Sequence, residues 1–191
     1  MNTREIFQKV KNYFSKVTFL IKIAIFVGLN KKRMSILQLG HKAPSFTLLN
    51  TDKKEIQLSD YHGKNVILLF FPFAFTGVCT KEMCIMRDDI ANYQKLNAEI
   101  LGISVDSPFT LAKFKEENNL SFPLLSDFNK VVSKAYDCLQ EDWAFGLKGV
   151  SKRSVFIIDK EGILKYSEIL DVAGNLPNFE AANDALAKLN L

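Results

Sequence analysis

Residues 66–87 read VILLFFPFAFTGVCTKEMCIMR, and this stretch decides the fold. Its first six residues are aliphatic or aromatic with no polar interruption, which predicts a strand buried on both faces. Pro72 then ends the strand, because proline cannot donate a hydrogen bond to a sheet ladder. After a short bend, apolar side chains recur at helical spacing from residue 80 to residue 95. The stretch therefore predicts a buried strand, a bend and a helix that opens at Cys79.

A cysteine at the start of a helix lies in an unusual electrostatic environment. The first turn leaves backbone N–H groups without intrahelical partners and carries a partial positive charge. This environment favours the thiolate, which is the reactive form of cysteine. The alternative is a structural residue, because free cysteine is among the most buried residue types. Position alone leaves both interpretations of Cys79 open.

The residues around Cys79 resemble a known active site. Residues 72–79, PFAFTGVC, fit the Pro-x-x-x-Thr-x-x-Cys pattern of the peroxiredoxins, the alkyl hydroperoxide reductase/thiol-specific antioxidant family of thiol peroxidases with a thioredoxin-like fold. The resemblance covers about residues 36–191. A second cysteine, Cys84, is similar to the bacterioferritin-comigratory or peroxiredoxin Q group. The sequence of residues 70–77 also resembles the one-cysteine alkyl hydroperoxide reductase E group.

Composition limits the other possibilities. A chain of 191 residues is long enough for one domain with a sizeable core. Three cysteines are too few for a secreted disulfide framework, and the two histidines are not spaced with cysteines as in a zinc site. We therefore expect no metal and no cofactor. We also expect no nucleic-acid partner, because no basic patch is visible outside the N-terminal segment.

Residues 1–35 form a basic, partly apolar N-terminal extension. Residues 1–33 hold eight basic side chains and one acidic, a net charge of +7, which leaves −3 of the overall +4 for the rest. Residues 4–24 show an apolar stripe at helical spacing with lysines on the other face. One interpretation is an amphipathic helix that makes peripheral contact with a membrane through residues 4–29. The other is a misassigned start, because Met34 can itself begin the domain.

Residues 36–191 alternate between strand and helix patterns. We therefore expect an α/β fold, a thioredoxin-like three-layer sandwich with a central mixed sheet. The expected strands are residues 46–49 and 56–58 as a hairpin, then 66–71, 100–105, 121–127 as a short extended piece, 155–158 and 163–169. The expected helices are residues 80–95, 108–118 capped by Ser107, 128–136 capped by Asp127, and 178–189.

The resemblance implies a role for each residue of the motif. Cys79 is the nucleophile that attacks the peroxide, and Thr76 hydrogen-bonds the peroxide, although it can also be a plain helix cap. Pro72 shields the sulfur pocket from water. Arg153, one of two arginines after residue 33, stands where peroxiredoxins carry the arginine that contacts the sulfur. Glu82 orients this arginine, or is an ordinary first-turn acid.

The second cysteine decides the mechanism. Residues five apart on an intact helix have Cα atoms roughly 8–9 Å apart, whereas a disulfide needs less than about 7 Å. A Cys79–Cys84 bond therefore requires the first turns of the helix to unwind, and the alternative is a packing role for Cys84. Cys138 is interpreted as structural. Trp143 and Phe145 precede Arg153 in the chain and are expected to wall its pocket.

These observations predict a thiol-dependent peroxidase acting on hydrogen peroxide or alkyl hydroperoxides. Its sulfenic acid at Cys79 is resolved by Cys84, and a thioredoxin-type reductant recycles the enzyme. The alternatives are a one-cysteine peroxiredoxin and a non-catalytic thioredoxin-fold binding module. A disulfide oxidoreductase is disfavoured, because the spacing is not Cys-x-x-Cys. We expect a cytoplasmic monomer or homodimer, with a peripheral membrane location as the minority interpretation.

Overall fold

The computed structural model describes residues 37–190. Its strands are β1 (Thr47–Asn50), β2 (Glu55–Gln57), β3 (Asn65–Phe70), β4 (Ala98–Ser104), β5 (Leu124–Ser126), β6 (Leu139–Asp142), β7 (Lys148–Ser151), β8 (Ser154–Ile158) and β9 (Leu164–Ile169). Its α-helices are α2 (Gly77–Asp88), α3 (Ile90–Lys95), α4 (Pro108–Glu117), α5 (Val131–Ala135) and α6 (Phe179–Ala187). Single 3-10 turns are η1 (Leu58–Tyr61), η2 (Ala144–Gly146) and η3 (Lys188–Asn190).

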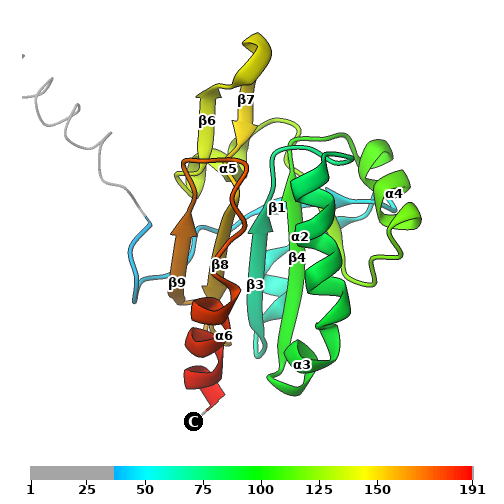
Figure 1. The fold of residues 1–191 in the computed structure, drawn as a ribbon. Helices are drawn as coiled ribbons and strands as arrows, with labels where there is room; N and C mark the ends of the chain where they lie inside the picture. The colour runs from blue at the N-terminus through cyan, green and yellow to red at the C-terminus, as the bar shows by residue number, and fades with distance from the viewer. Residues whose placement is uncertain (1–36, 191) are drawn as a thin grey trace, which may run out of the picture. The chain divides into compact units, whose positions relative to one another are not determined.

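Seven strands form one sheet in the order β2-β1-β5-β4-β3-β8-β9 (Figure 1). The pairs β3–β4 and β4–β5 are parallel, whereas β8 runs antiparallel to both β3 and β9. The strands β1 and β2 form the expected hairpin at one edge. The sheet is therefore mixed, and the predicted α/β fold is confirmed.

Both faces of β3 are covered, which explains its uninterrupted apolar sequence. Because side chains alternate along a strand, Ile67 and Leu69 belong to one core cluster, and Leu68 and Phe70 belong to the other. The first cluster includes residues of α2, α3, α4 and α6, and the second includes residues of α5. Helices therefore lie on both sides of the sheet, as the three-layer prediction requires.

One expectation about secondary structure is wrong, and one pair of strands was not predicted. The single helix expected over residues 80–95 begins earlier, at Gly77, and is divided at Asp89, whose backbone leaves helical geometry at φ −98° and ψ 7°. Cys79 is therefore the third residue of α2 rather than the first. The antiparallel pair β6–β7 was not expected, and this hairpin forms a separate two-stranded sheet.

The predicted cap at Ser107 is present. The side chain of Ser107 caps α4 by accepting a hydrogen bond from the backbone N–H of Thr110, and the side chain of Asn178, which was not predicted as a cap, accepts from Ala181 at the start of α6. Asp127 accepts hydrogen bonds from backbone N–H groups at the start of α5. These caps satisfy N–H groups that otherwise lack intrahelical partners.

The N-terminal extension, including the possible membrane segment at residues 4–29, lies outside the described residues. Its boundary with the domain at residues 35 and 36 stays a prediction. Among the helices of residues 37–190, none combines the length and apolarity that crossing a bilayer requires.

Candidate active site

The loop between β3 and α2 leaves the sheet at the edge where β4 also ends. Asp106, just beyond β4, accepts a hydrogen bond from the backbone N–H of Ala74 at 2.7 Å and another from the hydroxyl of Ser104 at 2.8 Å. The hydroxyl of Ser104 also lies 3.3 Å from the carbonyl oxygen of Pro72, and Pro72 itself is buried. The loop is thus attached to the neighbouring strand before α2 begins.

Two residues shape the bend that delivers the cysteine. Phe75 has a left-handed backbone conformation (φ +63°), and its ring packs against Phe114 of α4 with centroids 5.2 Å apart. Thr76 is the N-terminal cap residue of α2 by backbone conformation, but its hydroxyl does not cap the helix. Instead it donates to the carbonyl of Phe73 at 3.0 Å, which leaves the hydroxyl oxygen able to accept.

Cys79 and Arg153 meet although 74 residues separate them. Cys79 lies in the first turn of α2 with 1% of its surface exposed. A terminal N–H of Arg153 donates to its Sγ at 3.3 Å. The strand β8 pairs with β3 so that Ser154 is opposite Phe70, and Arg153 therefore lies level with the end of β3. Sheet topology brings the two groups together.

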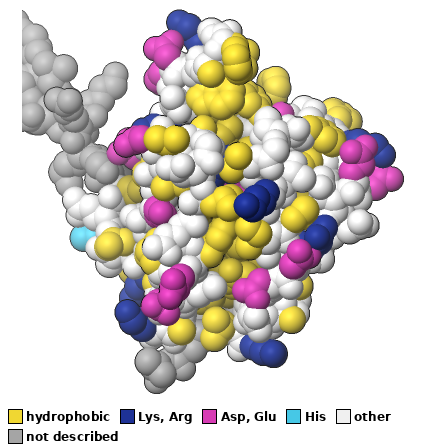
Figure 2. Space-filling model, viewed as in Figure 1, with side chains coloured by type: hydrophobic (Ala, Val, Ile, Leu, Met, Phe, Trp, Pro, Cys, Tyr) yellow, Lys and Arg dark blue, Asp and Glu magenta, His cyan; other side chains and the backbone are white. Residues whose placement is uncertain are grey.

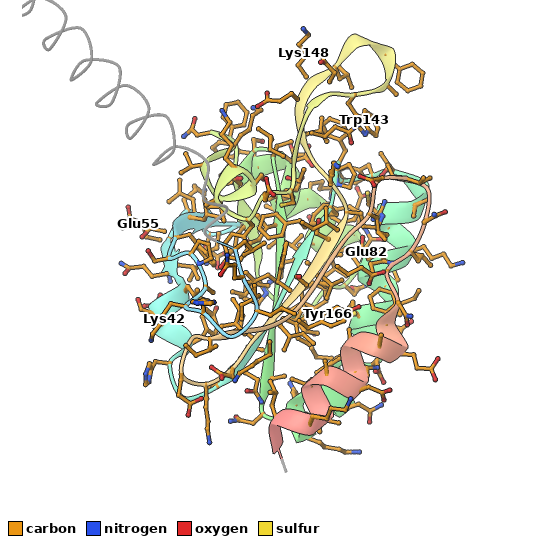
Figure 3. The ribbon with its side chains drawn as sticks, turned by 90° about the vertical axis from the view of Figure 1, so that its left-hand side faces the viewer. Lys42, Glu55, Glu82, Trp143, Lys148 and Tyr166 are labelled. Atoms are coloured by element: carbon orange, nitrogen blue, oxygen red, sulfur yellow. The ribbon has the colours of Figure 1, made fainter. Side chains whose placement is uncertain are left out.

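Arg153 is buried and is held on every side. One terminal nitrogen forms an ion pair with Glu82 of α2, whose side chain is fully buried. The carbonyl oxygen of Ala173, in the loop between β9 and α6, accepts from Nε at 3.3 Å and from the other terminal nitrogen at 2.9 Å. The guanidinium is therefore fixed in the orientation that points one of its N–H groups at the sulfur of Cys79. The position of Glu82 can be seen in Figure 3.

Burial and pairing oppose each other in this ion pair. Burial raises the pKa of Glu82 to about 7, against the lowering effect of Arg153. Burial lowers the pKa of Arg153, but Glu82 and Cys79 together raise it by more, so the guanidinium stays charged. Among the described residues, Oε1 of Glu82 has no hydrogen-bond partner.

This arrangement suits nucleophilic attack by sulfur. The first turn of α2 and the guanidinium of Arg153 both stabilise negative charge at the Sγ of Cys79. A donor that is already fixed also stabilises charge that develops on a departing oxygen. Within residues 37–190, no group of three or more His, Cys, Asp or Glu side chains is placed to hold a metal ion.

The family model described as AhpC/TSA family matches residues 39–167. The chain belongs to the AhpC/TSA family. It is 38% identical over 159 residues to peroxiredoxin-2 of Mus musculus, covering 78% of this chain and 76% of that protein. It is 36% identical over 157 residues to alkyl hydroperoxide reductase E of Mycobacterium bovis, covering 81% and 99%.

Solved structures show the same fold as this AhpC/TSA protein. The peroxidoxin BcpB of Mycobacterium tuberculosis superposes with a TM-score of 0.68 at 28% identity, covering 80% of this chain and 96% of that one. The reduced 2-Cys peroxiredoxin of Plasmodium vivax gives 0.70 at 30% identity, with the same coverage. The AhpC/TSA protein is therefore a peroxiredoxin, an enzyme that reduces peroxides with a thiol, and not a non-catalytic module.

The structure places Cys84 of this peroxiredoxin away from Arg153. Its side chain is partly buried, and its Sγ lies 3.9 Å from the amide oxygen of Asn118, the residue that ends α4. Cys138 is fully buried in the core cluster on the other side of the sheet, where burial raises the pKa of its thiol. The burial of Cys138 is consistent with its interpretation as a structural residue, whereas the role of Cys84, resolving or packing, stays a prediction.

The β6–β7 hairpin contributes one of the two expected aromatic residues. The ring of Trp143 packs edge-on against Phe73 of the active-site loop, with centroids 5.3 Å apart. Phe145 is 94% exposed, so the expectation that it walls the pocket is wrong. Its backbone is left-handed (φ +62°), and Leu147 nearby is also exposed. Figure 2 shows hydrophobic side chains at the end of the β6–β7 hairpin.

Two groups of the site were missed from the sequence. Asp106 follows a buried strand of the sheet, and a polar residue at that position is a detectable signal for a loop contact. The carbonyl of Ala173 has no side-chain signature, because every residue carries a backbone carbonyl. Only the course of the loop between β9 and α6 places it against Arg153.

Proposed function

We propose that the enzyme reduces hydrogen peroxide and alkyl hydroperoxides with Cys79 as the nucleophile. The Cys79 thiolate attacks one peroxide oxygen, the O–O bond breaks, and the sulfur becomes a sulfenic acid. The other oxygen takes a proton and leaves as water or an alcohol. The 3.3 Å hydrogen bond from Arg153 to Sγ is the observation that carries this proposal.

The other motif residues act around this sulfur. Glu82 and the carbonyl of Ala173 orient Arg153 so that its fork faces the sulfur and the peroxide. Thr76 presents its hydroxyl oxygen as an acceptor for the peroxide proton. Pro72 is buried at the start of the loop and keeps water from the sulfur.

Cys84 is the proposed resolving residue. Its thiolate attacks the sulfenic sulfur to form a Cys79–Cys84 disulfide, which a thioredoxin-type reductant then reduces. On the intact α2 the two Cα atoms are roughly 8–9 Å apart, so the first turns of α2 open during this step. The proteins that this chain resembles include both a 2-Cys peroxiredoxin and alkyl hydroperoxide reductase E. The one-cysteine scheme, in which an external thiol attacks Cys79, is therefore the second candidate.

Mass spectrometry after one equivalent of peroxide tests the proposal. We expect a loss of two hydrogens and a Cys79–Cys84 peptide pair in the wild type. Cys79→Ser should abolish peroxide reduction, and Cys84→Ser should retain the first turnover but slow the thioredoxin-driven cycle. A normal cycle in Cys84→Ser would instead establish the one-cysteine scheme. Peroxide reduction by Cys79→Ser would overturn the proposal itself.

The cellular setting follows from the chemistry. A cycle through a free thiol and a thioredoxin-type reductant operates in a reducing compartment, which supports the cytoplasm as the location. The active unit is a monomer or a homodimer. The hydrogen bonds and the ion pair described around Cys79 and Arg153 lie within one chain.

A further inference from the structure

A second cluster of polar groups lies where α2 meets the end of α4. Arg87, three residues after Cys84 on α2, donates from a terminal nitrogen to the backbone carbonyl of Asn118 at 2.7 Å. The side-chain oxygen of the same Asn118 faces the thiol of Cys84 at 3.9 Å. One residue at the end of α4 therefore contacts both Cys84 and Arg87.

The connection is more than a surface ion pair. Arg87 also pairs with Asp88 beside it, but both side chains reach solvent, and such pairs contribute little to stability. The hydrogen bond from Arg87 to Asn118 joins α2 to the end of α4, and the two residues are 31 positions apart in the chain. It also satisfies a carbonyl at the end of α4, where backbone carbonyls lack intrahelical partners and a cation is favourable.

The position of this connection along α2 is what matters for catalysis. Cys79 lies in the first turn, whereas Arg87 lies in the last turn, beyond Cys84. The opening that disulfide formation requires begins at the Cys79 end. A helix that opened over its whole length would carry both thiols away from each other and lose the geometry of attack.

We infer that Arg87 is a positioning residue for the disulfide step: through the carbonyl of Asn118 it fastens the turn of α2 that carries Cys84 to α4, so that only the segment before Cys84 opens. The inference rests on the proposed resolving role of Cys84. In the step itself the Cys84 thiolate attacks the sulfur of the Cys79 sulfenic acid. The S–S bond forms, the S–O bond breaks, and the hydroxide takes a proton and leaves as water. The Cys84 sulfur is oxidised and the sulfenic sulfur is reduced, with no further oxidant.

Rapid-quench mass spectrometry of the full chain separates the two steps. In Arg87→Ala we expect Cys79 oxidation by hydrogen peroxide at the wild-type rate, and disulfide formation slowed at least about tenfold, since a charged hydrogen bond is lost. The longer-lived sulfenic acid should then meet a second peroxide, so the sulfinic form of Cys79 should increase. Arg87→Lys should recover only part of the rate, because lysine keeps the charge but not the planar fork. Lys113→Ala, which removes an exposed pair on α4, is the matched control and should change neither step.

The Cys84→Ser background tests whether Arg87 acts through Cys84. There the disulfide step is absent, so adding Arg87→Ala should not change the lifetime of the sulfenic acid. A wild type that forms no Cys79–Cys84 disulfide would refute the resolving role of Cys84. A disulfide that forms at the normal rate in Arg87→Ala would overturn the inference alone. Equal slowing of both steps in Arg87→Ala and Arg87→Lys would also overturn it, since that result indicates general loss of structure.

Discussion

At the scale of single residues, the site depends on one buried cation with three acceptors. Arg153 donates to the Cys79 sulfur, to Glu82 and to the Ala173 carbonyl, and is only 1% exposed. Removing one partner of a buried pair leaves an uncompensated charge, which is strongly destabilising. Conservative substitutions are therefore the informative ones.

Arg153→Lys should slow Cys79 oxidation by about 100-fold, the usual effect of losing one fixed donor to a developing charge. Lysine retains a charge beside Glu82 but cannot supply the second, divergent N–H to sulfur. Stopped-flow measurement of the second-order rate with hydrogen peroxide checks this. Lys148→Ala, which breaks an exposed pair on the β6–β7 hairpin, is the control and should retain the wild-type rate. A less than threefold change in Arg153→Lys would contradict the assigned contact.

Glu82 should give folding stability a particular pH dependence. Folding raises the pKa of this carboxyl from an ordinary 4.5 to about 7, so the native state binds more protons than the unfolded state between these values. The contribution of Glu82 to the free energy of unfolding is therefore greatest below pH 4.5 and falls as the pH rises to about 7. Between pH 4.5 and pH 8, the free energy of unfolding, measured in urea, should fall by up to about 3 kcal/mol more in the wild type than in Glu82→Gln. Parallel pH profiles for the two proteins would contradict this.

At the scale of elements, β4 has no room for a side chain at Gly102. A Cβ at Gly102 would lie 2.5 Å from a methyl carbon of Leu124 on β5, and 3.5 Å from the sulfur of Met83 on α2, which is an ordinary contact distance. The glycine therefore permits the close approach of the Leu124 side chain to β4.

Gly102→Ala should therefore lower the free energy of unfolding by about 1–3 kcal/mol, the range for overpacked cores. Denaturant titration under reducing conditions measures the change. Gly77→Ala is the matched control, because a Cβ at Gly77, in the first turn of α2, meets nothing within 4 Å. It should be neutral or slightly stabilising, since alanine favours helix over glycine. If Gly102→Ala were as stable as Gly77→Ala, the close packing of Leu124 against Gly102 would be contradicted.

At the scale of the whole molecule, charge is divided unevenly along the chain. Residues 1–33 carry +7 and the remainder −3. Each basic residue near an anionic lipid surface contributes about 1 kcal/mol of attraction. The described groups of the active site all come from residues 72–173.

A chain that begins at Met34 should therefore keep kcat/KM for hydrogen peroxide within about twofold, because none of the described site contacts is lost. It should also lose co-sedimentation with vesicles that contain anionic lipid, if residues 4–29 make peripheral membrane contact. Neutral vesicles are the control for charge. Equal sedimentation of the two chains would favour the misassigned start, and a tenfold loss of activity would assign the extension a catalytic role.

Much of the site was predictable because its core is contiguous in sequence. The apolar run of β3, Pro72, Thr76 and Cys79 lie within fifteen residues. The residue types predict a strand, a bend and a helix that starts near a cysteine, and the resemblance to the peroxiredoxins implies that this thiol is reactive. Scarcity left two candidates, Arg87 and Arg153, as the arginines after residue 33, and the resemblance to the peroxiredoxins selected Arg153 by its place before a buried strand. The division of α2 from α3 was not, since neither glycine nor proline stands at Asp89 and the apolar spacing continues across it.

Sequence by itself determined the local chemistry of this protein: which cysteine stands in the first turn of a helix, where the strand stops, and which elements alternate. Tertiary structure decided the partners of that chemistry: the Ala173 carbonyl behind Arg153, the Asn118 carbonyl beside Arg87, and the solvent-facing position of Phe145. The physical reason is that side-chain type and spacing are written locally, whereas backbone carbonyls are identical in every residue. Only the path of distant loops selects which carbonyl meets which cation.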